Sequence, residues 1–256
     1  MKCSFAPHVA FVAGLVLAGV AHAQGSASSA SSSPTPAAPA TEGAPPSGYA
    51  WAGAWVSNDY AGGYAGALRT FNADNSLYDS GFAVRGDISG GEYSYSAPGF
   101  LDRNVSLVDA DVMVGYRKRA GAGTLSGYVG LAYIDHDNPD PAARPRGSKT
   151  GLALRGEYQI TPDSRTEIHL QARYATPFQT WSGSGRVLWK VSDRVSLGPE
   201  VSLTRNSRHR EVSVGPHMKL RTGAGELGFS AGYRHPTKSG AADGYYAAAY
   251  LAAPFR

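Results

Sequence analysis

From residue 49 onward the chain consists of about twelve runs of roughly ten residues in which apolar and polar side chains alternate. In the run RTEIHLQARYATPF the two kinds of side chain take opposite parities: Ile168, Leu170, Ala172 and Tyr174 against Glu167, His169, Gln171 and Arg173. Successive side chains of a β-strand point to opposite faces, so this period of two predicts a strand with one apolar and one polar face. After the N-terminal segment no run has a helical period.

Turn-forming residues separate the runs, and each run is expected to form one strand. The expected strands span residues 49–57, 60–71, 80–89, 104–116, 124–135, 149–160, 166–177, 181–191, 195–204, 210–222, 226–235 and 244–255.

The connections favour an outer-membrane barrel over a soluble periplasmic β-sandwich, whose strands average about five or six residues. A tilted strand crosses an outer membrane in about 9 to 11 residues, and tight periplasmic turns alternate with longer outer loops. Tight connections such as TPDS and TGAG alternate with longer segments at 90–103, 136–148 and 236–243. We therefore predict an all-β fold, a transmembrane outer-membrane antiparallel up-and-down β-barrel of about 12 strands, with its apolar rows facing lipid.

Aromatic residues toward the ends of the runs are expected to form girdles at the two membrane–water interfaces. These residues are Trp51, Trp55, Tyr60, Tyr64, Trp181 and Trp189.

The N-terminus predicts export of the chain. Residues 1–23 combine Lys2, an apolar run and the site Ala21-His22-Ala23, as in a cleaved signal peptide. Residues 24–48 are rich in Ala, Ser and Pro and are expected to form a disordered linker before the barrel at 49–256. Cleavage would remove Cys3, the single cysteine, so disulfides and thiolate chemistry are excluded from the mature protein. The expected location is the bacterial outer membrane.

The polar rows place many charged residues in the expected lumen. The candidate lumen-lining residues are Arg85, Asp87, Asp109, Asp111, Arg155, Glu157, Glu167, His169, Arg173, Arg186, Lys190, Glu200, His217, Lys219 and Arg221. Charges of both signs in a confined space should pair across strands. Such a row either fills the barrel with its own ion pairs or lines a conduit, since a barrel of about twelve strands lies between filled and open ones.

Other charged segments carry weaker signals. The oxygen-rich loop Asp135–Asp140 lacks the spacing of a calcium loop, so no metal is expected there. The net charge of +4 comes from scattered Lys and Arg, which excludes a nucleic-acid partner. The segment Arg205–Arg210 is either an exposed outer loop or a contact for lipopolysaccharide phosphates, and outer-membrane lipid is an expected partner in any case.

No motif indicates an enzyme or a cofactor. His169 and His217 fall on interior parity, His235 stands beside a proline in a loop mouth, and no Gly-x-Ser-x-Gly elbow occurs. Asp109 and Asp111 are close neighbours on one strand and form a single acidic patch, unlike the facing carboxylates of glycosidases.

Several spaced motifs resemble the cellulose biosynthesis protein BcsS family. The residues that carry the resemblance are Tyr128, Gly130, His136, Arg146, Gly147, Gly198, Pro199, Glu200, Gly215 and His217. The resemblance extends from about Tyr49 to Phe255 and implies an outer-membrane protein linked to cellulose production. This chain departs from the pattern at Ser213, where an arginine is expected, so an interior ion pair is either missing or rebuilt.

The resemblance implies an accessory role in cellulose biosynthesis or export, as a scaffold or a passage for glucan. In a passage, tyrosine rings would stack on sugar faces while Asp, Glu and Arg bind hydroxyl groups. The expected partners are then cellulose or another glucan and periplasmic components of cellulose synthesis. The alternatives are a general porin or structural barrel unrelated to polysaccharide, and an outer-membrane enzyme that modifies lipid.

Overall fold

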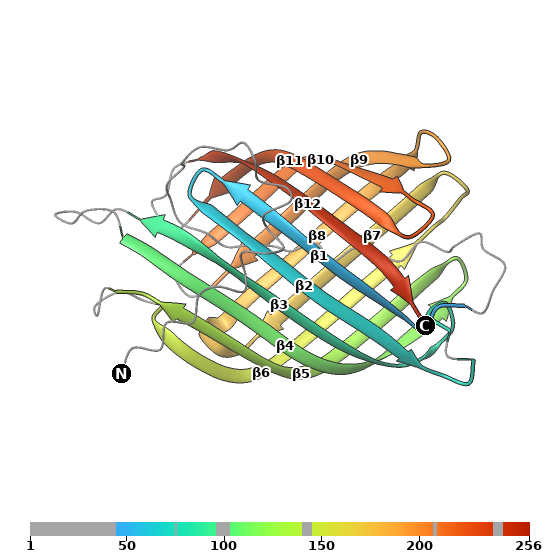
Figure 1. The fold of residues 1–256 in the computed structure, drawn as a ribbon, viewed down its shortest axis with the longest axis horizontal. Coiled ribbons are helices and arrows are strands. Elements are labelled where there is room, and N and C mark those ends of the chain that lie inside the picture. The colour runs from blue at the N-terminus through green and yellow to red at the C-terminus, as the bar shows by residue number, and fades with distance from the viewer. Residues whose placement is uncertain (1–44, 75, 96–102, 140–144, 207–208, 238–242) are drawn as a thin grey trace.

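The computed structural model describes residues 45–256 except 75, 96–102, 140–144, 207–208 and 238–242. The described residues form twelve strands: β1 (Gly48–Ser57), β2 (Tyr60–Phe71), β3 (Gly81–Tyr95), β4 (Arg103–Ala120), β5 (Gly123–Asp137), β6 (Gly147–Ile160), β7 (Thr166–Ala175), β8 (Thr180–Lys190), β9 (Val195–Arg205), β10 (Arg210–Arg221), β11 (Glu226–Pro236) and β12 (Gly244–Phe255). Each strand pairs with the next, and β12 pairs with β1, from Gly48 opposite Phe255 to Ser57 opposite Tyr246. The predicted up-and-down antiparallel barrel is confirmed (Figure 1).

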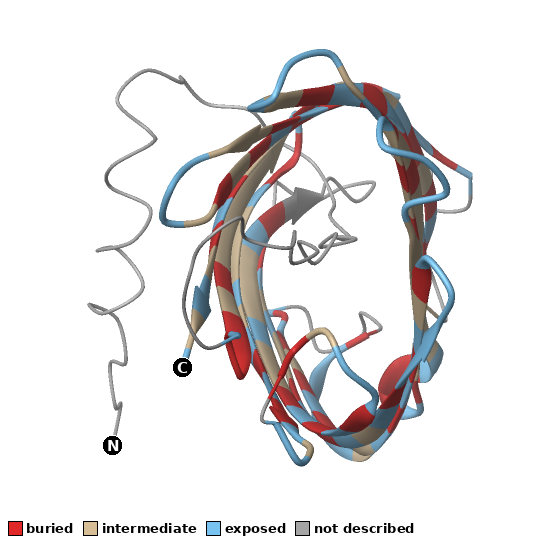
Figure 2. Ribbon diagram, turned by 90° about the vertical axis from the view of Figure 1, so that its right-hand side faces the viewer, coloured by how far each residue is buried: buried red, intermediate tan, exposed pale blue. Residues whose placement is uncertain are grey.

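The alternating rows face the two sides of the wall as predicted. On β7, Leu170 is 48% exposed whereas His169 is 4% exposed. On β4, Val112 and Val114 are likewise exposed, whereas Asp111 and Met113, on the opposite face of the strand, are buried. Figure 2 shows this alternation as bands of buried and exposed residues around the ring of strands. Apolar side chains cover the outside because the bilayer interior offers no partner for a charge.

Several strand ends differ from the sequence prediction. They include the end of β4, at Ala120 instead of residue 116, and the ends of β7 and β3. The strand expected to reach residue 177 stops at Ala175, because Pro177 has no N–H for the ladder and begins a short 3-10 turn, η1 (Pro177–Gln179). β3 continues to Tyr95 although the expected strand ended at residue 89. The pair Gly90-Gly91 was interpreted as the start of a loop, yet both glycines stay in register with β4.

Four of the six residues expected in the girdles instead face the lumen, so that prediction was wrong. Trp51 and Tyr60 are buried on the interior rows of β1 and β2. Trp55 stacks on Tyr60 with ring centroids 5.4 Å apart and packs at a tilt against Tyr64 at 5.5 Å. The other two, Trp181 and Trp189, are half exposed on the outside.

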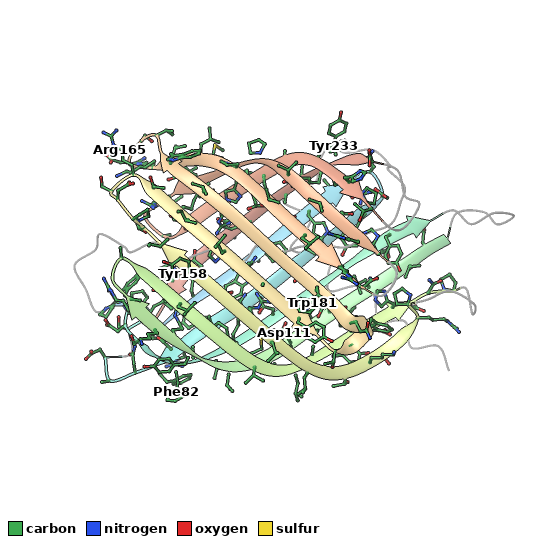
Figure 3. The ribbon with its side chains drawn as sticks, turned by 180° about the vertical axis from the view of Figure 1, so that it is seen from behind. Phe82, Asp111, Tyr158, Arg165, Trp181 and Tyr233 are labelled. Carbon is green, nitrogen blue, oxygen red and sulfur yellow. The ribbon has the colours of Figure 1, made fainter. Side chains whose placement is uncertain are left out.

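Outward aromatic pairs nevertheless lie near both ends of the barrel. Phe82 packs on Tyr116 near one end, and Tyr233 packs on Tyr245 near the other. Figure 3 shows Phe82 and Tyr233 projecting away from opposite ends of the wall. Outward aromatic rings at both ends of a barrel are typical of membrane–water girdles.

Gly48 and Phe255 lie side by side at one end of the barrel, which we call the terminal end. The last residues of the expected linker are attached there. The carbonyl of Ser47 accepts a hydrogen bond from the N–H of Thr70 at 2.8 Å, and the carbonyl of Pro46 accepts one from Leu77 at 2.8 Å. The expected signal peptide and most of the linker, residues 1–44, lie outside the described residues.

None of the helices in the described part of the chain has the length and apolar character needed to cross a membrane.

Candidate functional site in the barrel lumen

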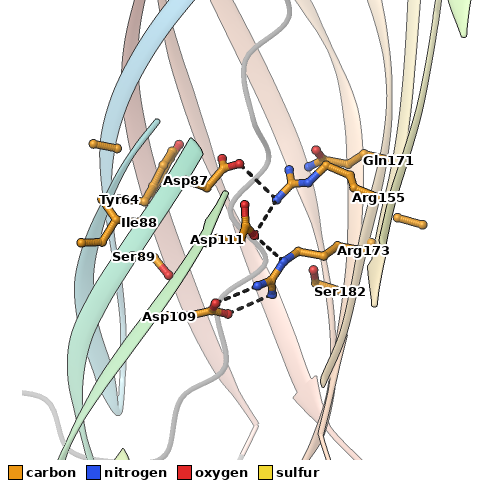
Figure 4. A pocket seen from close by; sticks show the side chains of 13 residues that line it. Tyr64, Asp87, Ile88, Ser89, Asp109, Asp111, Arg155, Gln171, Arg173 and Ser182 are labelled. Atoms are coloured by element: carbon orange, nitrogen blue, oxygen red, sulfur yellow. Dashed lines mark hydrogen bonds and ion pairs between the residues drawn. The ribbon is translucent and has the colours of Figure 1, made fainter. Parts of the chain in front are cut away.

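Seven of the fifteen candidate lumen residues gather in one group, the arginine–carboxylate cluster. It contains three arginines and four carboxylates from β3, β4, β6 and β7: Arg85, Asp87, Asp109, Asp111, Arg155, Glu157 and Arg173. Figure 4 shows the guanidinium groups of Arg155 and Arg173 pointing across the lumen toward the carboxylates of β3 and β4. The strands on each side of the cluster are separated in the wall by β5, so the side chains meet inside the lumen.

Arg173 binds both carboxylates of β4. Its Nη2 and Nη1 donate to Oδ1 and Oδ2 of Asp109 at 2.7 and 2.9 Å, and its Nε donates to Oδ2 of Asp111 at 2.8 Å. Two parallel hydrogen bonds between a guanidinium and a carboxylate are stronger and more directional than a single charged contact. Arg173 therefore fixes the side chains of β4 relative to β7.

Arg85 and Arg155 extend the cluster to β3 and β6. Arg85 Nε donates to Oδ2 of Asp87 at 2.6 Å, and its Nη1 donates to Oε1 of Glu157, also at 2.6 Å. Arg155 Nη2 lies 3.5 Å from Asp87 and 3.8 Å from Asp111. With one more carboxylate than arginine, the cluster is formally negative by one charge.

Two small cavities remain beside these side chains. One, of about 40 Å³, is bordered by Tyr64, Ser89, Asp109 and Ser182, and Figure 4 views it closely. The other, of about 30 Å³, has Trp51 and His169 in its lining. A water molecule needs roughly 10–15 Å³ of such volume, so each cavity has room for a few waters. At this level the ion-paired side chains reach across the lumen from β3 and β4 to β6 and β7.

A second group of charges lies nearer the terminal end. The ammonium group of the fully buried Lys219 pairs with Glu167 and lies 4.0 Å from Glu226 Oε2. Arg221 Nη2 reaches Glu167 at 3.4 Å, and the Tyr250 hydroxyl donates to Glu226 Oε1 at 3.2 Å. These pairs join β7, β10, β11 and β12.

Two other candidates complete the account of this region. His169 is buried opposite Arg186 in the register of β7 and β8. Lys190 has interior parity but lies at the rim, where its ammonium contacts Asp193 of the following turn at 2.9 Å.

Two of the family motifs meet in the wall. Gly198, Pro199 and Glu200 of β9 lie in antiparallel register with His217, Pro216 and Gly215 of β10. His217 Nδ1 lies 3.0 Å from Glu200 Oε2, and Arg186 Nη1 lies 3.8 Å from the same oxygen. The His217 ring also stacks on Tyr250 at 5.8 Å. The motifs therefore form one structural unit that presents a histidine–glutamate pair to the lumen.

The glycines of this unit have a packing role. A Cβ on Gly198 would collide with the carbonyl of Val187, and a Cβ on Gly215 would collide with the carbonyl of Ala231. Pro199 and Pro216 have no N–H to donate, and the registers with β8 and β11 are interrupted beside them. Gly198 and Gly215 therefore let β9 approach the backbone of β8 and β10 approach the backbone of β11 where the hydrogen-bond register is interrupted.

The other motif residues are spread along the barrel. Tyr128 is buried in the interior, and Gly130 approaches the carbonyl of Val112. His136 stacks edge-on against Phe178 at 4.9 Å. In a separate contact at the same end, Arg146 Nε donates to the carbonyl of Asn138 at 2.9 Å, and Gly147 takes a φ of 77°, which favours glycine.

The sequence prediction omitted a third charged group, the outer cluster, at the end of the barrel opposite the terminal end. Arg234 of β11 pairs with Asp59 and, at 2.9 Å, with Glu211, and His209 Nε2 lies 3.4 Å from Glu211. Glu211 and Arg234 have interior parity and could have been found by extending the rows. Asp59 lies in the turn between β1 and β2, where the alternation of strand residues cannot predict which way a side chain points.

This cluster also accounts for the departure at Ser213. Ser213 lies directly opposite Arg234 in the register of β10 and β11, and its hydroxyl donates to Glu211 at 3.4 Å. The interior ion pair of Glu211 is therefore made by an arginine from the neighbouring strand. The arginine at this level of the barrel is Arg234 of β11.

No group of three or more His, Cys, Asp and Glu in the described residues has the arrangement of a metal site. Part of the predicted loop Asp135–Asp140, including Asp140, lies outside the described residues. What the lumen offers chemically is a dense set of hydroxyl, carboxylate and guanidinium groups next to aromatic rings.

Comparison with known proteins identifies the family. The family model "Cellulose biosynthesis protein BcsS" matches residues 49–255. No curated protein matches the chain. Among solved structures, a KdgM porin has a TM-score of 0.47 at 8% identity, covering 81% of this chain and 99% of that one.

Two further structures have similar scores. The translocator domain of the autotransporter NalP from Neisseria meningitidis has a TM-score of 0.48 at 10% identity, covering 81% of this chain and 88% of that one. The Pseudomonas putida toluene transporter TodX has a TM-score of 0.48 at 8% identity, covering 81% and 89%. On the match over its whole barrel, the chain belongs to the cellulose biosynthesis protein BcsS family.

Proposed function

We propose that this barrel is a non-catalytic accessory protein of cellulose biosynthesis or export, and that it acts as an outer-membrane scaffold. The observation that carries the scaffold role is the occupied lumen. Ion pairs between strands that are not neighbours, such as Arg85 with Glu157 and Lys219 with Glu167, cross the interior. The two cavities beside them have room for only a few water molecules each. An open passage would require several of these buried pairs to separate, which costs several kcal/mol each.

The family match supports glucan as the polymer that the scaffold serves. The cavity beside Tyr64 has room only for water, and its lining shows the chemistry that the lumen presents. It combines one aromatic ring with serine hydroxyls, carboxylates and the Arg173 guanidinium. A few placed polar groups beside an aromatic surface are the usual composition of a site for a small polar ligand. Arg173 pairs with Asp109 and Asp111, and the more exposed of the two, Asp109, borders this cavity.

The proposal is tested by deletion and by conductance. Deletion in a cellulose-producing host should reduce the binding of a cellulose dye, and the intact gene should restore it. The purified barrel in planar bilayers should conduct almost no current. Unchanged dye binding with altered solute uptake would favour a general porin. An altered lipid A mass after deletion would favour a lipid-modifying enzyme, and porin-like conductance would exclude the closed scaffold.

A further inference from the structure

Two arginines lie side by side on the outer surface at the end opposite the terminal end. Arg205 is the last residue of β9 and Arg210 the first of β10, and the two are directly opposite in register. Both are exposed, on the outward parity of their strands. Within the described residues neither forms an ion pair with a carboxylate. Like charges directly opposite across two strands repel each other, so this pair is unfavourable unless an anion binds between them.

Hydrogen bonds hold the strand ends that carry the arginines. Asn206 N donates to the carbonyl of His209 at 2.8 Å, and His209 N donates to Oδ1 of Asn206 at 2.8 Å. The carbonyl of Arg210 accepts the N–H of Thr237 on the β11 side at 2.7 Å. Glu211, the adjacent carboxylate, is buried in the lumen with Arg234 and does not neutralise the outer pair. The two guanidinium groups are therefore presented from a fixed backbone.

The surroundings match the headgroup depth of a bilayer. Trp181 of β8 lies opposite Arg205 in register and packs on Tyr174 with ring centroids 4.4 Å apart. Interfacial aromatic residues of this kind mark the membrane–water boundary. Toward the middle of the barrel, the same outward rows carry the exposed apolar residues Val201, Leu203 and Val214. The surface thus has a cationic rim above an apolar face.

We propose that Arg205 and Arg210 bind a phosphate of lipid A in the outer leaflet, with acyl chains lying on the apolar rows of β9 and β10. Guanidinium groups bind phosphate oxygens through paired hydrogen bonds. The arginines lie at the outer end of the barrel, because barrels of this class return both chain ends to the periplasmic side. The bound phosphate offsets the repulsion between the two arginines and anchors the β9–β10 hairpin.

The test compares two double variants in lipid vesicles. R205Q/R210Q removes the proposed site, and R165Q/R194Q removes two exposed arginines from turns at the terminal end. The thermal unfolding midpoint is measured with bisphosphorylated lipid A, with enzymatically dephosphorylated lipid A and with inorganic phosphate. We expect bisphosphorylated lipid A to stabilise the native protein and R165Q/R194Q, and to bind R205Q/R210Q at least tenfold more weakly.

Three results would overturn the proposal: equal binding by R205Q/R210Q and the native protein, equal stabilisation by dephosphorylated lipid A, or an equal loss in R165Q/R194Q. Full protection by inorganic phosphate alone would overturn the lipid source of the anion. R205K/R210K keeps both charges without the planar fork and should bind more weakly than the native protein and more tightly than the glutamine variant. Native-like binding by the lysine variant would reject the bidentate geometry.

Discussion

Replacing Arg173 by methionine tests whether the arginine–carboxylate cluster is a buried, mutually dependent network. The change keeps most of the volume and apolar stem but removes the guanidinium that holds Asp109 and Asp111. The cluster then has two arginines and four carboxylates. Breaking a buried pair by removing one partner costs about 3–5 kcal/mol, because the remaining charge is left buried without compensation.

The structure places the expected loss at the lower end of that range. The Asp109 side chain is 20% exposed and keeps part of its hydration. Asp111 is only 2% exposed but retains Arg155 at 3.8 Å. We therefore expect R173M to lower the free energy of unfolding by about 3 kcal/mol. The measurement is denaturant unfolding of the barrel in vesicles, followed by tryptophan fluorescence and by gel mobility of unheated samples.

A double-mutant cycle separates loss of the pair from loss of packing. R173M/D111N removes one of the uncompensated charges and should recover more than 1 kcal/mol relative to R173M. Arg165 is an exposed turn arginine, so R165M should change stability by less than about 0.5 kcal/mol. A loss below 1 kcal/mol for R173M, or no recovery in the double variant, would mean that water already hydrates these carboxylates and that the lumen is not closed.

Two further changes test the packing of the interior. G66A should lower the free energy of unfolding by about 1–3 kcal/mol, because its Cβ would lie 2.5 Å from the Trp51 ring. G127A is the matched control, since a Cβ there would meet nothing within 4 Å. Both variants are measured by thermal unfolding. S213R should cost about 1 kcal/mol because it sets a second arginine opposite Arg234, and S213R/R234S should recover that loss in a denaturant titration. No recovery in the double variant would reject the idea that β11 supplies the arginine of this level.

A third change tests hydrogen bonding at the outer rim. Tyr233 and His235 each contact the carboxylate of Asp243 at 2.5 Å, and the Tyr233 hydrogen bond, followed by that of His235, lowers the pKa of Asp243. Y233F should therefore raise the pKa of Asp243 toward its ordinary value, which carboxyl NMR titration can measure. The carboxylate is charged above that pKa, so the contribution of this contact should fade as the pH falls through it. An unchanged pKa in Y233F would show that the hydroxyl does not donate to Asp243 in solution.

The strands and the contents of the lumen could be predicted from the sequence because both depend on parity. A charged residue such as Asp111 or Lys219 is costly on the lipid-facing side of a barrel strand, so the alternation of side chains assigns it to the interior. The pairing within the lumen could not be predicted, since Arg85 contacts Glu157 on a strand three places away. Such contacts depend on how the barrel closes and on its cross-section, which a linear pattern does not contain.

The wrong prediction for the aromatic girdle shows where parity is insufficient. β1 carries alanine on one row and large aromatic rings on the other, so both rows are compatible with lipid. The size of the residue opposite each ring on β2 decides which row faces inward. Trp51 lies opposite Gly66, and Trp55 lies opposite Gly62. A ring that lies flat over a glycine on the curved inner side fills space that an alanine would leave empty. In a wall that is apolar on both sides, the complementarity of large and small residues in register therefore sets which face turns inward.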